Sequence, residues 1–422
     1  MMSKYWDKNI ECAKREKIFA LQNKRFLKQL QRVYKNLPHY REKLKYENVE
    51  IKDIISLRDL YKLPFTTKED ITDTYPFGLF AVPKKDIIRI HTSSGTTGKP
   101  KIVGYTQKDI EMWQRCCARA FTAIGVTKKD VVHISYGYGL FTGGLGIHYG
   151  SEMVGAMTVP VGTGNTQKQA MLINDLGSTC ICCTPSYALF LAEELEKMCI
   201  HENSLRVGFL GAEVWTEEMR KEIQIRLGIK AYDIYGLSEI MGPGVAFECE
   251  YQNGLHINED NFVAEIIDPD TLQVLGENQK GELVITCITK EGFPLIRYRT
   301  GDICSITSEK CKCGRTFIRM SKIIGRTDDM CIIRGVNVFP SQIESVLINF
   351  GYSSPKFYLY IDRINNRDIL DIVVLKDESI LKREQEVKKS IESVLGLSVN
   401  IRFVDNYEVE EGKIRKVFDN RK

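Results

Sequence analysis

Between residues 131 and 235, short apolar runs alternate with helical patterns, and this alternation constrains the fold more than any other feature of the chain. The apolar runs of strand length are residues 131–136, 156–160, 179–183, 207–210 and 231–235. The amphipathic segments between them are residues 166–176, 186–198 and 216–227. Strands that alternate with helices predict a mostly parallel sheet with helices on both faces. We therefore expect an α/β fold.

The regions before and after residues 131–235 show other patterns of apolar and polar residues. Residues 4–60 are helical in pattern, and residues 107–124 place their apolar side chains on one stripe of a helix. Residues 262–268 and 281–289 resemble strands with turns between them, which predicts an antiparallel β subdomain. Beyond residue 325, two helical segments, an apolar hairpin and a last strand predict a small α+β domain. The expected domains are residues 1–327 and 328–422.

Composition excludes several classes of protein. The 59 basic and 55 acidic residues leave a net charge of +4, so the charge gives no reason to expect nucleic acid or a membrane as a partner. Charged residues interrupt every hydrophobic run before it reaches the length of a membrane helix. The first 26 residues lack the apolar centre of a signal peptide. With 13 cysteines that resemble reduced core thiols, we expect a cytoplasmic protein.

A loop rich in glycine, serine and threonine follows the strand-like residues 87–90. Its backbone N–H groups can converge on an anion, because glycine allows conformations that are closed to other residues. A P-loop needs four residues between its first glycine and its Gly-Lys pair, whereas only two separate Gly95 from Gly98. The spacing argues against a kinase or P-loop ATPase. The residues expected to grip phosphate are Ser93, Ser94, Gly95, Thr96, Thr97, Gly98 and Lys99.

Three further segments carry polar groups suited to a nucleotide. Glu239 follows a predicted strand and stands beside Ser238, and a carboxylate next to a hydroxyl can hold Mg²⁺ against phosphate oxygens. Asp302, with an arginine nearby, can accept hydrogen bonds from ribose hydroxyls. Lys413 lies in a polar loop near the C-terminus. Taken singly, each segment also fits an ordinary exposed turn.

Together, and in this order, these segments resemble the adenylate-forming superfamily of acyl-CoA synthetases, adenylation domains and luciferase-like enzymes. Within it the chain resembles the phenylacetate–CoA ligase family over nearly its whole length. Residues 234–245 (IYGLSEIMGPGV) and 325–344 (GRTDDMCIIRGVNVFPSQIE) are the most specific stretches. The resemblance implies a ligase that adenylates an aryl carboxylic acid such as phenylacetate and transfers the acyl group to coenzyme A. It also implies ATP, Mg²⁺ and coenzyme A as cofactors, and a homodimer.

The resemblance assigns roles to residues of both expected domains. Glu239 corresponds to the Mg²⁺ ligand and Asp328 to the hinge about which the small domain rotates. Lys413 corresponds to the lysine that bridges the substrate carboxylate and the α-phosphate. Acidic residues precede it where the family has a hydroxyl and a basic residue, and Lys416 is a weaker substitute. Besides the glycine-rich loop, the nucleotide-binding residues would be Gly211, Ala212, Glu213, Asp233, Tyr235, Gly236, Ser238, Asp302 and Arg326.

An aromatic, glycine-rich segment at residues 136–144 follows a predicted strand. It combines flat rings with open space, so it can wall a pocket for an aromatic ring, although a buried strand end is an equal interpretation. The family places the acyl group here. The residues expected to line the acyl pocket are Tyr136, Phe141, Gly143, Ala212, Ile240, Met241, Gly242 and Pro243.

Four residues could bind zinc. Cys311 and Cys313 form a tight pair on a turn, and Cys249 and His256 frame another. Together they would make a tetrahedral structural site, and the alternative is two unrelated thiol clusters.

Two other functions fit parts of these patterns. An adenylation enzyme that loads a carrier protein uses the same pantetheine thiol as acceptor. A non-catalytic ligand-binding relative is the second alternative, and Glu239, Asp302, Arg326 and Lys413 argue against it.

Overall fold

The computed structural model describes residues 4–93, 100–327, 331–333, 336–352, 355–364, 367–381, 383–406 and 417–420. The chain divides into two compact units. Unit 1 consists of Met1–Thr184, Glu194–Ala212 and Ile229–Lys322, and unit 2 of Pro185–Glu193, Glu213–Gly228 and Ile323–Lys422. The division into domains 1–327 and 328–422 stays a prediction, and Asp328 lies outside the described residues.

Unit 1 is built on a nine-stranded sheet with the order β13-β14-β9-β8-β7-β6-β5-β3-β4. Five of its strands pair in parallel, and each coincides with one of the apolar runs. They are β3 (Val131–Ile134), β4 (Met157–Val159), β5 (Cys180–Cys183), β6 (Val207–Gly211) and β7 (Lys230–Tyr235). Every residue of β5 and β6 is buried, as expected of strands covered on both faces. The predicted α/β fold is confirmed.

The other end of this sheet is antiparallel. Its strands are β8 (Ala246–Glu248), β9 (Leu255–Ile257), β13 (Ile306–Thr307) and β14 (Arg319–Met320). The pairs β7–β8 and β8–β9 follow one another along the chain, so short turns suffice to connect them.

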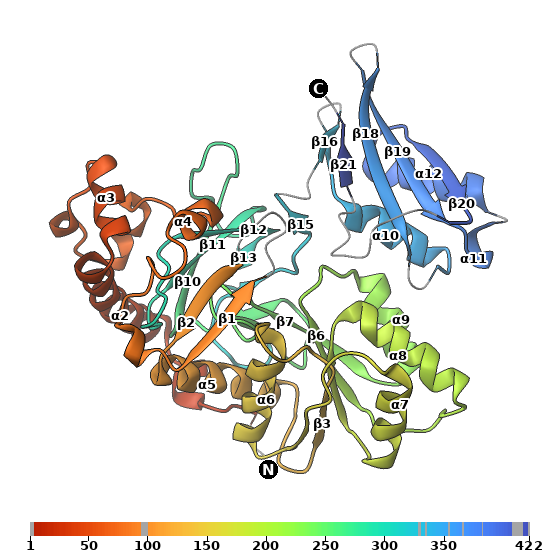
Figure 1. Ribbon diagram of the computed structural model, residues 1–422, viewed down its shortest axis with the longest axis horizontal. Coiled ribbons are helices and arrows are strands. Elements are labelled where there is room, and N and C mark those ends of the chain that lie inside the picture. The colour runs from red at the N-terminus through yellow and green to blue at the C-terminus, as the bar shows by residue number, and fades with distance from the viewer. Residues whose placement is uncertain are drawn as a thin grey trace. The chain divides into compact units, whose positions relative to one another are not determined.

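Helices α6 (Thr142–Val154) and α7 (Thr166–Asp175) lie on opposite faces of the parallel strands. The β3–α6–β4 connection runs outward to the edge strand, and β4–α7–β5 returns past β3 to its other neighbour. Right-handed crossovers in opposite directions put their helices on opposite faces. Figure 1 shows α6 and α7 on either side of β3.

Helix α5 (Gln107–Ala123) packs against α6. It begins at Gln107 because Thr106 and Asp109 form a capping box. The helix α6 did not follow from the sequence pattern, because four of its thirteen residues are glycine. A Cβ at Gly146 would lie 2.3 Å from Cζ2 of Trp113, and one at Gly150 would lie 2.3 Å from Cβ of Cys117. The glycines therefore serve the close approach of the two helices.

The rest of unit 1 combines helices and antiparallel strands. The helices are α1 (Lys8–Glu11), α2 (Arg15–Asn36), α3 (Pro38–Tyr46) and α4 (Lys68–Asp73), with 3-10 turns η1 (Ile51–Asp53), η2 (Leu57–Lys62) and η3 (Lys84–Asp86). Strands β1 (Arg89–Ser93) and β2 (Lys101–Tyr105) form a hairpin. The expected antiparallel subdomain consists of β10 (Phe262–Ile267), β11 (Gly281–Cys287) and β12 (Tyr298–Cys304).

Unit 2 contains α9 (Glu217–Leu227) and the C-terminal α+β region, while α8 (Pro185–Lys197) contributes its first residues. Its four-stranded sheet has the order β20-β19-β18-β21. The long hairpin of β18 (Phe357–Ile364) and β19 (Arg367–Leu375) is flanked by β20 (Asn400–Val404) and β21 (Val417–Asp419). The remaining elements are α10 (Pro340–Asn349), α11 (Glu378–Leu381), α12 (Glu384–Leu395), β15 (Gly325–Arg326), β16 (Cys331–Ile333) and β17 (Val336–Val338).

Helices α10 and α12 pack together, and their apolar side chains share one core with the hairpin strands. Over the residues that the structure describes, no helix has the length and apolar character needed to span a membrane.

Candidate functional site

The candidate site of unit 1 lies at the carboxyl ends of the parallel strands. Strand order reverses between β3 and β5, and ligands bind outside the carboxyl ends of strands at such a switch point. Tyr136 follows β3, and its hydroxyl donates to the carbonyl of Gly211 at the end of β6, at 3.4 Å. The fold thus connects a residue predicted for the acyl pocket with one predicted for the nucleotide.

The backbone at these strand ends is unusually tight. Ala212 has φ of +69°, a left-handed conformation that residues with a Cβ seldom adopt. A Cβ at Gly236 would lie 1.7 Å from the carbonyl oxygen of Gly242, so no larger residue fits there. Strained backbone of this kind clusters at functional sites, where surrounding structure holds it in place.

Tyr235 and Asp302 are in direct contact. The Tyr235 hydroxyl, at the end of β7, donates to Oδ2 of Asp302 in β12 at 2.7 Å. Burial, and then the nearby Asp302 charge, raise the pKa of Tyr235 well above its ordinary value, so the phenol keeps its proton. The bond holds the Asp302 carboxylate in one direction. Asp233, within β7, is fixed through its backbone N–H, which donates to Glu248 at 2.7 Å.

Glu239 is buried and faces a lysine that was not among the predicted site residues. Nζ of Lys101, in β2, lies 3.6 Å from Oε1 of Glu239. Burial lowers the pKa of Lys101, against the attraction of the Glu239 carboxylate. The neighbouring Ser238 hydroxyl lies 3.0 Å from that of Thr142, at the start of α6. A carboxylate and a hydroxyl are ligand types that suit Mg²⁺.

The glycine-rich segment connects the two strands of the β1–β2 hairpin, where Ser93 pairs with Lys101. Its remaining members lie outside the described residues, namely Ser94, Gly95, Thr96, Thr97, Gly98 and Lys99. The hairpin nevertheless brings Lys101, just beyond the segment, to Glu239.

Most residues predicted for the acyl pocket belong to the turn after β7 and to the start of α6, where a Cβ at Gly242 would lie 2.8 Å from Cβ of Thr142. Ile240 and Met241 are buried in the turn after β7, and the carbonyl of Pro243 accepts from Nε1 of Trp113 at 2.8 Å. Gly242 has φ of +103°, and a Cβ there would lie 2.5 Å from the Trp113 ring. Phe141, in contrast, is 42% exposed at the start of α6, and Gly143 packs directly beneath its ring.

Two predicted nucleotide-binding residues belong to unit 2. The Glu213 carboxylate accepts from the Ser186 backbone at 3.1 Å and from the Ser186 hydroxyl at 2.8 Å. Arg326 is the second residue of β15. Lys413, like Asp328, lies outside the described residues.

The four predicted zinc ligands form one buried cluster. The ligand atoms of Cys249, His256, Cys311 and Cys313 all lie within 4.8 Å of one another. Sγ of Cys313 is 3.4 Å from Nε2 of His256, and Sγ of Cys249 is 3.7 Å from Sγ of Cys311. A hydrogen bond from the Cys249 thiol lowers the pKa of Cys313 despite burial, which favours a thiolate there. The alternative of two unrelated thiol clusters is therefore wrong.

The cluster is tied to the first residues of the chain. The Tyr5 hydroxyl donates to the carbonyl of Cys313 at 2.7 Å, and Nε of the buried Arg315 lies 2.7 Å from the Glu11 carboxylate. The backbone N–H of Arg315 also points to Sγ of Cys313, at 3.4 Å. The turn that carries two of the cysteines is thus held from both sides.

His91 gives the large unit a pH-dependent stability. Burial lowers its pKa from 6.5 to about 4, assisted by the charges of Arg89 and Lys290, although Nδ1 contacts the Leu140 carbonyl at 3.2 Å. The His91 side chain is protonated below about pH 6.5 in the unfolded chain but only below about pH 4 in the folded chain. Its contribution to the free energy of unfolding is therefore fully present above pH 6.5 and is lost as the pH falls towards 4. We expect a lower urea midpoint at pH 5 than at pH 7, and a smaller difference in His91→Gln.

The control for this pH effect is His201→Gln, which changes an exposed histidine and should keep the full wild-type difference. If His91→Gln shows the same pH difference as the wild type, other groups cause it.

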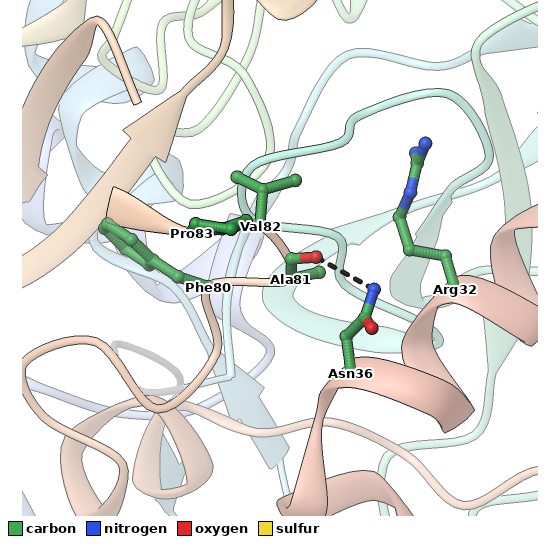
Figure 2. Close-up of a pocket in the computed structure, with 6 residues that line it drawn as sticks. All are labelled: Arg32, Asn36, Phe80, Ala81, Val82 and Pro83. Carbon is green, nitrogen blue, oxygen red and sulfur yellow. Dashed lines mark hydrogen bonds between the residues drawn. The ribbon is translucent and has the colours of Figure 1, made fainter. Parts of the chain in front are cut away.

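A cavity of about 450 Å³ lies apart from these residues, where the N-terminal helices meet the segment after α4. Figure 2 shows its six lining residues, among which Asn36 donates to the Ala81 carbonyl at 3.0 Å. None of the predicted site residues lines it.

Comparison with known proteins gives a family match over most of the chain. Residues 21–287 match the family described as AMP-binding enzyme, and residues 335–421 match the AMP-binding enzyme C-terminal domain. The resemblance found in the sequence is confirmed.

Similar proteins cover the chain from end to end. It is 48% identical to the phenylacetate-coenzyme A ligase of Escherichia coli (strain K12) over 98% of this chain and 97% of that protein. The Thermus thermophilus enzyme of the same name is 44% identical, with 98% and 99% covered. A crystal structure of 2-hydroxyisobutyryl-CoA ligase in the postadenylation state matches 99% of this chain and 93% of its own, with a TM-score of 0.89 and 25% identity.

Proposed function

The chain belongs to the AMP-binding enzyme family, and we propose that it adenylates an aryl carboxylic acid of the phenylacetate kind and transfers the acyl group to coenzyme A. It is an AMP-forming acid–thiol ligase. The observation that carries the choice of acid is the near-complete coverage, at 44–48% identity, by phenylacetate-coenzyme A ligases from several bacteria. The hydrogen bond between Tyr235 and Asp302, and the buried Glu239 in the turn after the same strand β7, support the proposal.

The chemical difficulty of the first half-reaction is that a carboxylate must attack an anionic phosphate. The protein must bring two negative groups together and neutralise the charge that develops, which is electrostatic positioning rather than proton transfer. We assign the glycine-rich segment to the β- and γ-phosphates and Asp302, held by Tyr235, to the ribose. Glu239 would hold Mg²⁺, which when bound offsets phosphate charge. Lys413 would contact both the carboxylate and the α-phosphate.

Pyrophosphate leaves as the acyl-adenylate forms, and the thiol of coenzyme A then displaces AMP. For the second step we propose that the C-terminal domain, residues 328–422, rotates about Asp328 and removes Lys413. The related 2-hydroxyisobutyryl-CoA ligase supports such a change, since it has been solved in a postadenylation and in a thioesterification state.

The experiment that tests the function is a pyrophosphate-release screen over a panel of carboxylic acids, with and without coenzyme A. Release with phenylacetate-like acids and thioester formation with coenzyme A would support the proposal. Release without thioester formation would favour the rival that loads a carrier protein. No release with any acid would favour the non-catalytic relative.

We also propose that the Cys249, His256, Cys311 and Cys313 cluster holds a structural zinc ion. Three thiols and an imidazole suit zinc, and four protein ligands leave no open position for catalysis. We expect about one zinc per chain in the purified protein. The variant Cys313→Ser should lose the metal and lower the thermal unfolding midpoint by about 5 °C or more.

The matched control for zinc is Cys199→Ser, which alters an exposed thiol and should change neither value. A wild-type protein free of zinc after purification without chelators would refute the assignment.

Two further proposals concern the cellular location and the oligomeric state of the enzyme. We propose a cytoplasmic location, because none of the thirteen cysteines forms a disulfide, as expected in a reducing compartment. A homodimer stays a prediction from the resemblance, and the mass in solution would test it.

A further inference from the structure

The buried turn after β7 contains successive carbonyl groups that are not hydrogen-bonded within the turn itself. The carbonyl of Leu237 accepts from the N–H groups of Ile240, Met241 and Gly242 at 3.1, 2.9 and 2.7 Å. The next four carbonyls, of residues 238–241, accept no backbone hydrogen bond within the described part of the chain. Carbonyl groups need hydrogen-bond donors when they are buried, as the residues of this turn are.

Two side chains from other elements supply these donors. The Tyr105 hydroxyl, at the end of β2, lies 3.2 Å from the Ser238 oxygen and 2.9 Å from the Met241 oxygen. Nζ of Lys290 lies 2.8 Å from the Ile240 oxygen and 3.4 Å from the Glu239 oxygen. One phenol and one ammonium group therefore contact all four carbonyls of the turn, and the Cys287 thiol adds a weak donor to the Ile240 oxygen at 4.0 Å.

Lys290 is an unusual lysine. Its side chain is 0% exposed, and Nζ lies 4.2 Å from the centre of the Tyr105 ring. Within the described part of the chain, no carboxylate forms an ion pair with it. A buried charge that lacks such a partner costs stability, and an apolar residue of similar volume is often neutral or stabilising in its place. Packing alone does not account for a lysine at this position.

The backbone around Lys290 is fixed from the opposite side. The Asp109 carboxylate accepts from the N–H groups of Glu291 at 2.6 Å and Gly292 at 2.9 Å. Arg32, in α2, lies 2.6 Å from the Glu291 carboxylate, and Gln29 donates to the Lys290 carbonyl. A Cβ at Gly292 would lie 2.7 Å from the carbonyl oxygen of Gly104, so this segment packs directly on β2. The backbone that carries the Lys290 side chain is therefore held in place by hydrogen bonds on both sides of the residue.

We infer that Lys290 is a positioning residue, which together with Tyr105 fixes the turn of residues 238–241 and so aims the Glu239 side chain into the site. This inference rests on the proposed function, because it assigns Glu239 to Mg²⁺ in the adenylation reaction. Lys290 itself touches the backbone of the turn and not the reacting groups. Because small displacements of a positioned group can cost about 10²-fold in rate, loss of this hold should reach the chemistry.

The test compares Lys290→Met with the wild type in pyrophosphate release at increasing Mg²⁺ and in urea unfolding. We expect kcat/KM for adenylation to fall roughly 10- to 100-fold and the Mg²⁺ concentration for half-maximal rate to rise severalfold. The urea midpoint should stay close to that of the wild type, because removal of a buried charge offsets the loss of a donor to two buried carbonyls. A wild type without pyrophosphate release would instead defeat the proposed function.

Two further variants complete the design. Lys108→Met removes an exposed lysine 3.7 Å from the same Glu291 and should behave as the wild type. Tyr105→Phe removes the other donor to the turn and should raise the Mg²⁺ requirement in the same direction, which keeps the inference testable if Lys290→Met does not fold. Unchanged Mg²⁺ dependence in both variants, with or without a loss of stability, would overturn it.

Discussion

In the variant Lys413→Ala, acyl-adenylate formation is expected to slow by roughly 10²–10³-fold, the scale for losing one preorganised charged donor. In our mechanism the ammonium group contacts the carboxylate and the α-phosphate only during the first half-reaction. Thioester formation from preformed acyl-adenylate and coenzyme A should therefore proceed at nearly the wild-type rate. Single-turnover measurements of the two half-reactions would show the difference.

The natural control is Lys416→Ala, which removes the lysine three positions later in the sequence. It should leave both half-reactions intact. If Lys413→Ala slows both half-reactions equally, the role assigned to Lys413 is wrong. If Lys416→Ala instead slows only adenylation, Lys416 is the lysine that contacts the carboxylate and the α-phosphate.

The second large effect is expected for Glu239→Gln, with a loss of roughly 10²-fold or more in adenylation. Glutamine keeps the shape of the side chain but lacks the negative charge that would hold Mg²⁺ in the proposed mechanism and that faces Lys101 at 3.6 Å. Higher Mg²⁺ should recover part of the rate, because the weakened site can be filled by mass action. Pyrophosphate release measured over a range of Mg²⁺ concentrations tests both points.

Glu111→Gln, on helix α5, is a matched change of charge away from the site and should be neutral. An active Glu239→Gln enzyme with an ordinary Mg²⁺ requirement would show that another group holds the metal.

The sequence was sufficient to predict the parallel part of the fold, because strands buried on both faces are continuous apolar runs. The runs at residues 179–183 and 207–210 became β5 and β6, buried in every residue. The two pairs of cysteine and histidine ligands were recognisable from their short spacing. That the pairs meet, 62 positions apart at Cys249 and Cys311, was left open by the sequence and is shown by the fold.

Other features depend on contacts that spacing along the chain does not reveal. Helix α6 was missed because its glycines lower helix propensity, while their value lies in the close packing on Trp113 and Cys117. Lys290 stands between two strands in a polar turn sequence, Thr289-Lys290-Glu291-Gly292, where a lysine usually reaches solvent. Only the fold brings it beneath the turn that carries Glu239.

The contacts of Tyr5 and Glu11 with the turn of the cysteine and histidine cluster have a consequence for folding during synthesis. Glu11 leaves the ribosome long before Arg315, its partner 304 positions later, and Cys313 emerges just ahead of that arginine. The nascent N-terminal segment must therefore wait, without its buried ion pair, until most of the polypeptide has been synthesised. Closure of the cysteine and histidine cluster around its partners Tyr5 and Glu11 is consequently a late event in folding during synthesis.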